Sequence, residues 1–276
     1  MFWLIQNAKF QEHGVKAIYD YILEKGLDHK LVMTPAFTDL ILDGATDISK
    51  LDFDINNVPE IELPSDTPVM TIGSYSLAKA AIKKGWKPGA FINDNFTFSR
   101  WVSGWGKDSL LNGHAIEAPI KDIVVPENME KLFARPSEDT KSFSGQVFER
   151  ENFIYWLNKI INAEFNDEFT KDTSIIFSPV VEIECEFRLF VVDGKIVTGS
   201  LYKSKDRVLY SQHVDKSALD FANEMIKIWQ PDRAFALDVA LTPSGPKIIE
   251  INNINSAGFY AADLPKFVDA IEKMVF

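Results

Sequence analysis

The stretch FALDVALTPSGPKIIEINN, residues 235–253, decides how the chain is expected to fold. An apolar run broken only by Asp238 leads into a dense group of turn formers, and a second apolar run follows, broken by Glu250 and Asn252. This pattern predicts a β-hairpin. Glu250 and Asn252 are two residues apart and share a face, and the hairpin can bring Asp238 alongside them. Two carboxylates and an amide oxygen suit Mg²⁺, which usually also takes nucleotide phosphates; the alternative is a surface hairpin with solvated acids.

The bulk composition excludes several classes of protein. The chain has 276 residues, enough for one large domain or two smaller ones, with 46% apolar and 25% charged residues. A formal net charge of -11 argues against a general nucleic-acid binder. The N-terminus lacks the basic flank and long apolar core of a secretory signal, and no apolar run is long enough to span a bilayer. With a single cysteine, Cys185, interpreted as a small core residue, we expect a cytoplasmic protein without a membrane partner.

Residues 1–85 are predicted to form a small α/β unit. Strands that alternate with helices indicate a mostly parallel sheet, whereas residues 48–57 are ambiguous between element types. The predicted elements are strands at 2–6, 30–33 and 69–73 and helices at 14–25 and 77–84.

Residues 86–125 are rich in aromatic side chains, among them Trp101 and Trp105. A stacking platform for nucleic acid is one interpretation. The acidity of the chain favours the other, a packed linker or docking surface between lobes.

From residue 126 the chain changes character. A predicted strand at 129–136 carries Arg135 at its end, and residues 137–145 form a small, polar loop around Lys141. Such a loop can lay backbone amides and an ammonium group over phosphates, although a solvated surface loop is the simpler interpretation of this stretch alone. It is not a P-loop, because the chain contains no Gly-x-x-x-x-Gly-Lys-Ser/Thr motif. An amphipathic helix is predicted at 149–162.

A second hairpin is predicted over residues 179–203. Asp193-Gly194 is a strong turn signal between two alternating apolar runs. On the first run Glu182, Glu184, Glu186 and Arg188 fall two apart and share a face. Three neighbouring carboxylates repel one another unless a cation or a ligand meets them; a charged outer face of an amphipathic sheet edge is the alternative. Further helices are expected at 216–229 and 264–275.

The order of these elements is specific. A strand with Arg135, a loop with Lys141, a helix, a Glu-x-Glu-x-Glu-x-Arg hairpin, a helix and an Asp…Glu-x-Asn hairpin follow one another. This order resembles the ATP-grasp superfamily over residues 85–276, and the segment IEINNINSAGFY, residues 249–260, carries the strongest similarity. The pattern looks most like a small clade, often phage or bacterial, named for a characteristic arginine and two lysines.

The resemblance implies an α/β (α+β) ATP-grasp fold. Two α+β lobes would enclose a nucleotide cleft, preceded by a small N-terminal α/β domain. The expected divisions are 1–85 for that domain, 86–125 for the aromatic-rich segment and 126–276 for the nucleotide-binding and catalytic domain.

The resemblance also implies an ADP-forming ligase that uses ATP and Mg²⁺. A small-molecule or peptide carboxylate would be converted to an acylphosphate, which an amine or a thiol then attacks; a homodimer is left open. The alternatives are an ATP-grasp small-molecule kinase and a nucleotide-binding interaction protein without catalysis.

The resemblance assigns roles to residues one by one. Arg188 and Lys203 match the catalytic cations that face the transferred phosphate, and Asn253 and Asn255 are further candidates for substrate or metal contacts. Arg135, Lys141, Arg188 and Lys203 would together form a positive funnel for ATP in an acidic protein. Arg188→Ala or Glu250→Gln is expected to abolish ATP turnover while the fold survives. The ATP-binding candidates are Arg135, Lys141, Val181, Glu182, Ile183, Glu184 and Lys203, and the magnesium candidates are Asp238, Glu250 and Asn252.

Overall fold

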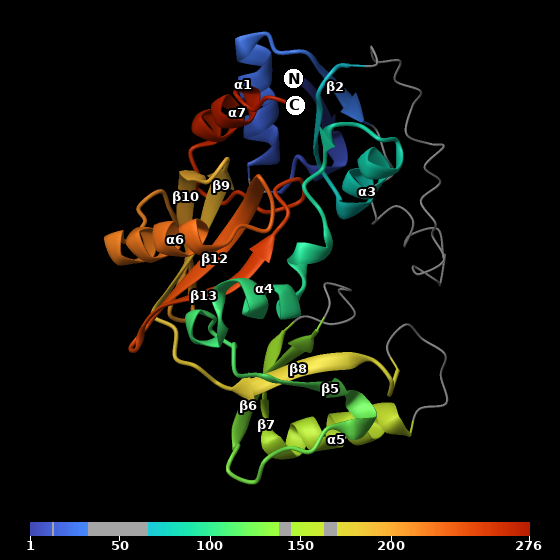
Figure 1. Cartoon of the computed structure of the whole chain (residues 1–276), viewed down its shortest axis with the longest axis vertical. Helices are drawn as coiled ribbons and strands as arrows, with labels where there is room; N and C mark the ends of the chain where they lie inside the picture. Colours follow the sequence, from blue (N-terminus) through green and yellow to red (C-terminus); the bar gives the residue numbers. More distant parts are fainter. Residues whose placement is uncertain (13, 33–65, 138–144, 163–169) are drawn as a thin grey trace.

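Three β-sheets follow one another along the long axis of the molecule in the computed structural model (Figure 1). The structure describes residues 1–12, 14–32, 66–137, 145–162 and 170–276. The α/β class predicted from the sequence is confirmed. The ambiguous stretch at 48–57 and Lys141 lie outside the described residues. None of the helices in the described ranges combines the length and the apolar character that a membrane span requires.

The first sheet belongs to the N-terminal unit and is parallel, with strand order β2-β1-β3-β4. It continues to β4, a few residues beyond the predicted boundary at 85. Its core is completed by the last helix of the chain, α7, which packs against α1. The elements are β1 Phe2–Gln6, η1 Asn7–Lys9, α1 Val15–Lys25, β2 His29–Val32, β3 Val69–Ile72, α3 Tyr75–Lys83, β4 Pro88–Gly89 and α7 Leu264–Glu272.

The central sheet has the antiparallel strand order β11-β10-β9-β12-β13. Both predicted hairpins are confirmed, since β9 pairs with β10 around the Asp193-Gly194 turn and β12 pairs with β13. Asp193 and Gly194 both have positive φ angles, which suits an Asp-Gly turn. The elements are β9 Cys185–Val192, β10 Lys195–Ser204, β11 Arg207–Ser211, α6 Lys216–Ile228, β12 Ala234–Thr242 and β13 Gly245–Asn252.

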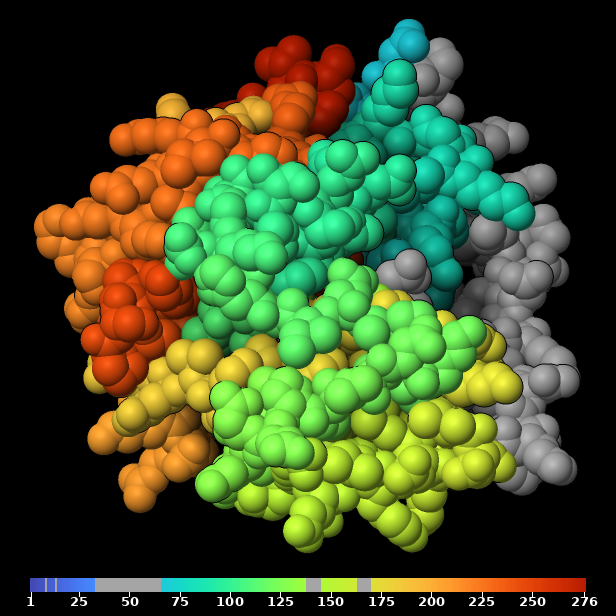
Figure 2. Space-filling model, turned by 60° about the horizontal axis from the view of Figure 1, so that its bottom comes forward, coloured from blue at the N-terminus to red at the C-terminus, as the bar shows by residue number. Residues whose placement is uncertain are grey.

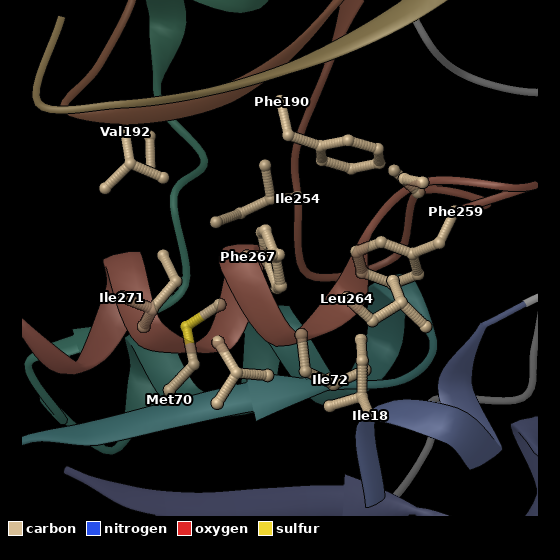
Figure 3. Close-up of a cluster of buried hydrophobic side chains, with 14 of the residues drawn as sticks. Ile18, Met70, Ile72, Phe190, Val192, Ile254, Phe259, Leu264, Phe267 and Ile271 are labelled. Atoms are coloured by element: carbon tan, nitrogen blue, oxygen red, sulfur yellow. The ribbon is translucent and has the colours of Figure 1, made fainter. Parts of the chain in front are cut away.

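The two faces of the central sheet bury different cores, because side chains alternate along each strand. Phe190 on β9 and Ala236 on β12 face the core shared with the N-terminal unit and α7, and Figure 3 shows Phe190 beside Phe259 and Phe267 there. Leu189 and Leu237, each one residue away, face the core that α6 covers. The first face therefore continues, two residues at a time, from apolar positions to Arg188 on β9 and Asp238 on β12.

The third sheet forms a small lobe with strand order β5-β8-β6-β7, packed on α5. It corrects two sequence predictions. Residues 116–119 pair with β8, so the segment between lobes ends before Ile116 and not at residue 125. Residues 180–184 are not strand, so the predicted strand from 179 is wrong at its start. The elements are β5 Ile116–Pro119, η6 Ile120–Asp122, β6 Lys131–Pro136, β7 Gln146–Glu149, α5 Arg150–Ile161 and β8 Ser174–Pro179.

The aromatic-rich segment is packed, as its sequence predicts. It contains η4 Asp94–Phe96, α4 Phe98–Trp105 and η5 Lys107–Ser109. The side chains of Phe98, Trp101 and Trp105 are buried in the core beneath α6. In Figure 1 α4 lies between the central sheet and the small lobe, and in Figure 2 the blue-green surface of this segment meets the light-green surface of the lobe.

Candidate active site

A buried ion pair lies at the centre of the polar face of the central sheet. Arg188 on β9 stands directly opposite Asp238 on β12 in the antiparallel register. Its guanidinium donates from Nε to Oδ1 at 2.8 Å and from Nη2 to Oδ2 at 2.7 Å, and Nη1 donates to the Gly258 carbonyl at 3.2 Å. The two side chains are only 9% and 2% exposed. This two-bond fork fixes both groups and strengthens their attraction in a site with little water.

Burial is the main influence on the Asp238 carboxyl. It raises the pKa of Asp238 to about 6, although the Arg188 guanidinium opposes the rise and the charges of Glu250 and Glu186 add to it. Burial also disfavours charge on Arg188, but Asp238 outweighs it and holds the pKa of the guanidinium above its usual range. The pair therefore exists as a guanidinium and a carboxylate at neutral pH.

The three predicted magnesium ligands lie together. Glu250 on β13 stands opposite Asp238, next to a register shift between Asp238 and Val239, and Asn252 Nδ2 donates to Glu250 Oε1 at 3.0 Å. Within the described ranges no group of three His, Cys, Asp or Glu side chains is arranged to hold a metal, so a site here must be mixed. Carboxylate and amide oxygens suit Mg²⁺, which completes its shell with water and phosphate. The donor set thus fits the ion, with Glu250 and Asn252 as its accessible members.

A second ion pair lies beside the first on the same face. Lys203 Nζ on β10 donates to Glu186 Oε1 at 2.8 Å, and the Tyr202 hydroxyl donates to Glu186 Oε2 at 2.8 Å. Burial, and the charges of Asp238 and Glu186, raise the pKa of Tyr202, so its hydroxyl remains a donor. Glu186 was not among the predicted site residues, although its position two residues before Arg188 on one strand is a signal that could have found it.

Aromatic rings enclose the Arg188 guanidinium. Its Cζ lies 5.1 Å from the ring centroid of Tyr260 and 5.8 Å from that of Tyr202. Tyr260 stacks between Tyr202, at 5.0 Å, and Tyr210 of β11, at 5.3 Å. Tyr260 also has a φ of 52°, an unusual angle for a non-glycine residue. The rings shield the guanidinium from water and limit the directions in which it can turn.

Arg135 joins the small lobe to the central sheet. It extends from the end of β6, and its Nη1 lies 3.9 Å from Glu250 Oε2 on β13. Its guanidinium carbon also lies 5.1 Å from the ring centroid of Trp101 and 5.8 Å from that of Phe98 on α4. The predicted nucleotide and magnesium residues of two different sheets are thus in contact across the junction of the lobes.

The positive funnel expected from the sequence is not what the described residues form. Arg135 faces Glu250, while Arg188 and Lys203 bind carboxylates directly. The three positive charges are thus balanced by the three negative charges of Glu250, Asp238 and Glu186. Strand pairing places an acidic residue opposite Arg188 and Lys203, whereas Arg135 reaches Glu250 from a different sheet, across the junction of the lobes. A neutral set of this kind suits a ligand that itself carries both signs of charge.

Residues 181–184 cross from the small lobe to the central sheet, between β8 and β9. Val181 and Ile183 are half-buried, whereas Glu182 and Glu184 are exposed. The backbone of Glu184 donates to the Leu241 carbonyl and accepts from the Lys205 amide, both at 2.8 Å. The carboxylates of this stretch therefore do not line up with Arg188 as the strand prediction required.

Asn253 and Asn255 use their side chains inside the protein. Asn253 Oδ1 accepts from the backbone amide and the hydroxyl of Ser256. Asn255 is 1% exposed; its Oδ1 accepts from the Phe91 amide and its Nδ2 donates to the Thr71 carbonyl. Asn255 thus ties the loop after β13 to the N-terminal sheet, and the substrate or metal contact expected for it stays a prediction.

The small lobe and the central sheet thus meet at Arg135, beside a set of paired charges, and comparison with known proteins places this arrangement in the ATP-grasp superfamily. The chain belongs to this superfamily, because residues 114–270 match the model of an ATP-grasp domain, family 2 of the clade named for an arginine and two lysines. The resemblance inferred from the sequence is therefore confirmed.

Solved ATP-grasp ligases share the fold along nearly the whole chain. PsnB in complex with a minimal precursor aligns over 98% of this chain and 97% of its own, with 11% identity and a TM-score of 0.55. D-cycloserine synthetase DcsG aligns over 98% of both chains, with 9% identity and a TM-score of 0.61. D-alanine–D-alanine ligase from Bacillus anthracis covers 99% of this chain and 92% of its own, with 12% identity and a TM-score of 0.51. No curated protein matches the chain.

Proposed function

We propose that the protein is an ADP-forming ligase that joins a carboxylate to an amine or a thiol through an acylphosphate, acting in the cytoplasm. Family membership and the shared fold of the ATP-grasp ligases support the class. The observation that carries the proposal is the set of three cation–carboxylate pairs where the lobes meet. Mg-ATP carries both signs of charge: its phosphates attract the cations of the set, and its metal attracts the carboxylates.

The residues divide by position. Arg135 and the crossing stretch 181–184 lie where the two lobes meet, and we assign the nucleotide to them, with Lys141 over its phosphates. Arg188 and Lys203 lie on neighbouring strands of the central sheet, β9 and β10, and we assign the transferred phosphate to them. Phosphoryl transfer depends on positioning and charge neutralisation, which suits a fixed guanidinium and a more exposed ammonium.

Glu250, Asn252 and Asp238 would hold Mg²⁺, which when bound neutralises charge on the phosphates. Arg188 holds Asp238 in place through both of its carboxylate oxygens, so Glu250 and Asn252 would be the more accessible ligands. The reaction itself would use two displacements. A carboxylate oxygen of the acceptor attacks the γ-phosphorus and ADP leaves with the bond electrons; the nucleophile then attacks the acyl carbon and phosphate leaves.

The products test this proposal. The protein is incubated with Mg-ATP and pools of amino acids and peptides, since solved structures of the same fold include the ligase PsnB with a precursor peptide and a D-alanine–D-alanine ligase. A ligase releases ADP and free phosphate in equal amounts, and hydroxylamine traps the acylphosphate as a hydroxamate. Phosphate that stays on the acceptor would instead identify a kinase. Failure of the protein to bind Mg-nucleotide would refute both.

A further inference from the structure

The helix between the lobes carries one polar atom with no role so far. Trp101 and Trp105 lie four residues apart on α4, and both side chains are buried, at 4% and 5% exposure. Trp105 Nε1 donates to the Met225 carbonyl at 2.9 Å and to the Trp229 carbonyl at 3.2 Å. Among the residues that the structure describes, Trp101 Nε1 is the buried side-chain nitrogen without a hydrogen-bond partner. Buried donors are almost always paired, so this exception needs an explanation.

The position of the indole suggests what would pair with it. The Arg135 guanidinium carbon lies 5.1 Å from the Trp101 ring centroid, and Arg135 Nη1 lies 3.9 Å from Glu250 Oε2. Trp101 is therefore separated by one side chain from a proposed magnesium ligand. Phe98, the other ring beside Arg135, has no donor and is buried in the same core, so burial there does not by itself require an indole nitrogen.

We propose that Trp101 Nε1 donates a hydrogen bond to a phosphate oxygen of the bound Mg-nucleotide. The inference rests on the proposed function, because it takes the nucleotide to lie where the lobes meet. Arg135 stacks over the face of the indole, whereas the buried Nε1–H points out along the ring edge, so a phosphate that draws the guanidinium away from Glu250 meets Nε1 only if this movement also uncovers that edge. Arg135 and Trp101 then bind the same phosphate group, the first as a cation and the second as a neutral donor, and the apparent defect in α4 is a binding contact.

Matched variants separate this role from simple packing. Trp101→Phe removes the unpaired donor and keeps the ring, and Trp105→Phe removes a donor that is paired inside the protein. Binding of Mg-ADP is measured by calorimetry, and stability by urea unfolding without nucleotide. For Trp101→Phe we expect about tenfold weaker binding, the effect of one hydrogen bond to a charged group, with an unchanged or higher unfolding midpoint. For Trp105→Phe we expect a lower midpoint and affinity within about twofold of the wild type.

The outcomes are distinct. A wild type that binds no Mg-ADP refutes the proposed function itself. A wild type that binds it while Trp101→Phe binds equally well refutes the Trp101 contact alone. A midpoint that falls as far in Trp101→Phe as in Trp105→Phe means that the indole is paired within the protein, and this also refutes the contact.

If Trp101→Phe does not fold, a measurement on the wild type still tests the contact. Indole ¹⁵N–¹H spectra are recorded with and without saturating Mg-ADP. One indole resonance is expected to shift downfield and to exchange more slowly with solvent when its donor becomes paired. If every indole resonance keeps its position in the saturated protein, the contact is refuted.

Discussion

Removal of Arg188 is expected to destabilise the fold as well as to stop turnover. Arg188 supplies hydrogen bonds to both oxygens of Asp238, whose side chain is 2% exposed. In Arg188→Met the carboxyl is left buried without its counter-charge and takes up a proton. At about pH 7 that uptake costs about 4 kcal/mol relative to an ordinary aspartate, of which wild-type Asp238, with its pKa of about 6, already bears about 3 kcal/mol. Protonation alone therefore makes Arg188→Met about 1.4 kcal/mol less stable than the wild type at that pH, and the loss of both hydrogen bonds to Asp238 adds to this. The expectation from the sequence that Arg188→Ala leaves the fold intact stays a prediction, and the buried pair argues for a loss of folding free energy as well.

The same reasoning fixes a pH dependence. Folded Arg188→Met keeps a proton on Asp238 that the unfolded chain has lost, so acidification stabilises the variant. Wild-type Asp238, with its pKa raised by burial to about 6, is charged above that value. The stability gap between the two proteins should therefore narrow by about 1.4 kcal/mol per unit as pH falls from about 8 to 6. Below about pH 6 it should stay constant, because both folded proteins are then protonated at Asp238.

The assay is a double-mutant cycle by urea unfolding with Arg188→Met, Asp238→Leu and the double variant. Because the double variant leaves no buried charge, we expect a coupling of about 3 kcal/mol. The exposed pair Lys16–Asp20 on α1, with side chains 60% and 54% exposed, is the control and should couple by less than about 0.5 kcal/mol. Two results would refute the reasoning. One is that the unfolding free energies lost in Arg188→Met and Asp238→Leu simply add in the double variant. The other is that the stability difference between the wild type and Arg188→Met does not change with pH.

Three further predictions address the site and the frame around it. Glu250→Gln should lower ATP turnover at least about a hundredfold, about 3 kcal/mol in barrier, with an unchanged urea midpoint, because its side chain is 36% exposed; normal turnover removes Glu250 from the site. Burial raises the pKa of Tyr202, so as pH rises the unfolded chain loses the hydroxyl proton before the folded protein does. Above about pH 10 the unfolding free energy of the wild type, measured with urea, should therefore fall by about 1.4 kcal/mol per pH unit more than that of Tyr202→Phe. Equal pH dependence of the two unfolding free energies would contradict this. Gly14 has φ 94°, and a Cβ added there would lie 2.5 Å from Phe259 Cβ, so Gly14→Ala should lower the unfolding free energy by about 3 kcal/mol. The control Gly26→Ala, whose added Cβ would meet no atom, should lower it by about 1 kcal/mol. Equal losses in the two variants would be evidence against the clash.

The sequence was sufficient for what is local. The two hairpins, the acid pattern of the second and the order of basic residues follow from neighbouring positions, and they carried the family resemblance that the family model confirms. Alternation alone could not show where β9 begins. The period-two pattern runs on through Glu182 and Glu184, but the chain there is crossing between lobes.

What the sequence could not supply is the pairing between distant strands. Arg188 and Asp238 are 50 residues apart, and only the register of β9 on β12 shows that they bind each other. The same holds for Asn255, whose side-chain amide donates to the Thr71 carbonyl in the N-terminal sheet. The segment around Trp101 is packed, as one of its two sequence interpretations held, but whether an indole donor is paired depends on contacts that no local pattern encodes.

The packing of α7 against α1 has a consequence for synthesis. Trp3 Nε1 donates to Glu272 Oε1 at 2.5 Å, a contact between residues 269 positions apart. At ribosomal speed the first helix emerges on the order of ten seconds to a minute before its partner exists. During that interval Ile18, Ile22 and their apolar neighbours have no cover from the C-terminal helix. Nascent chains should therefore depend on chaperones until α7 has left the exit tunnel, and a ribosome stalled before that point would present an aggregation-prone, protease-sensitive fragment.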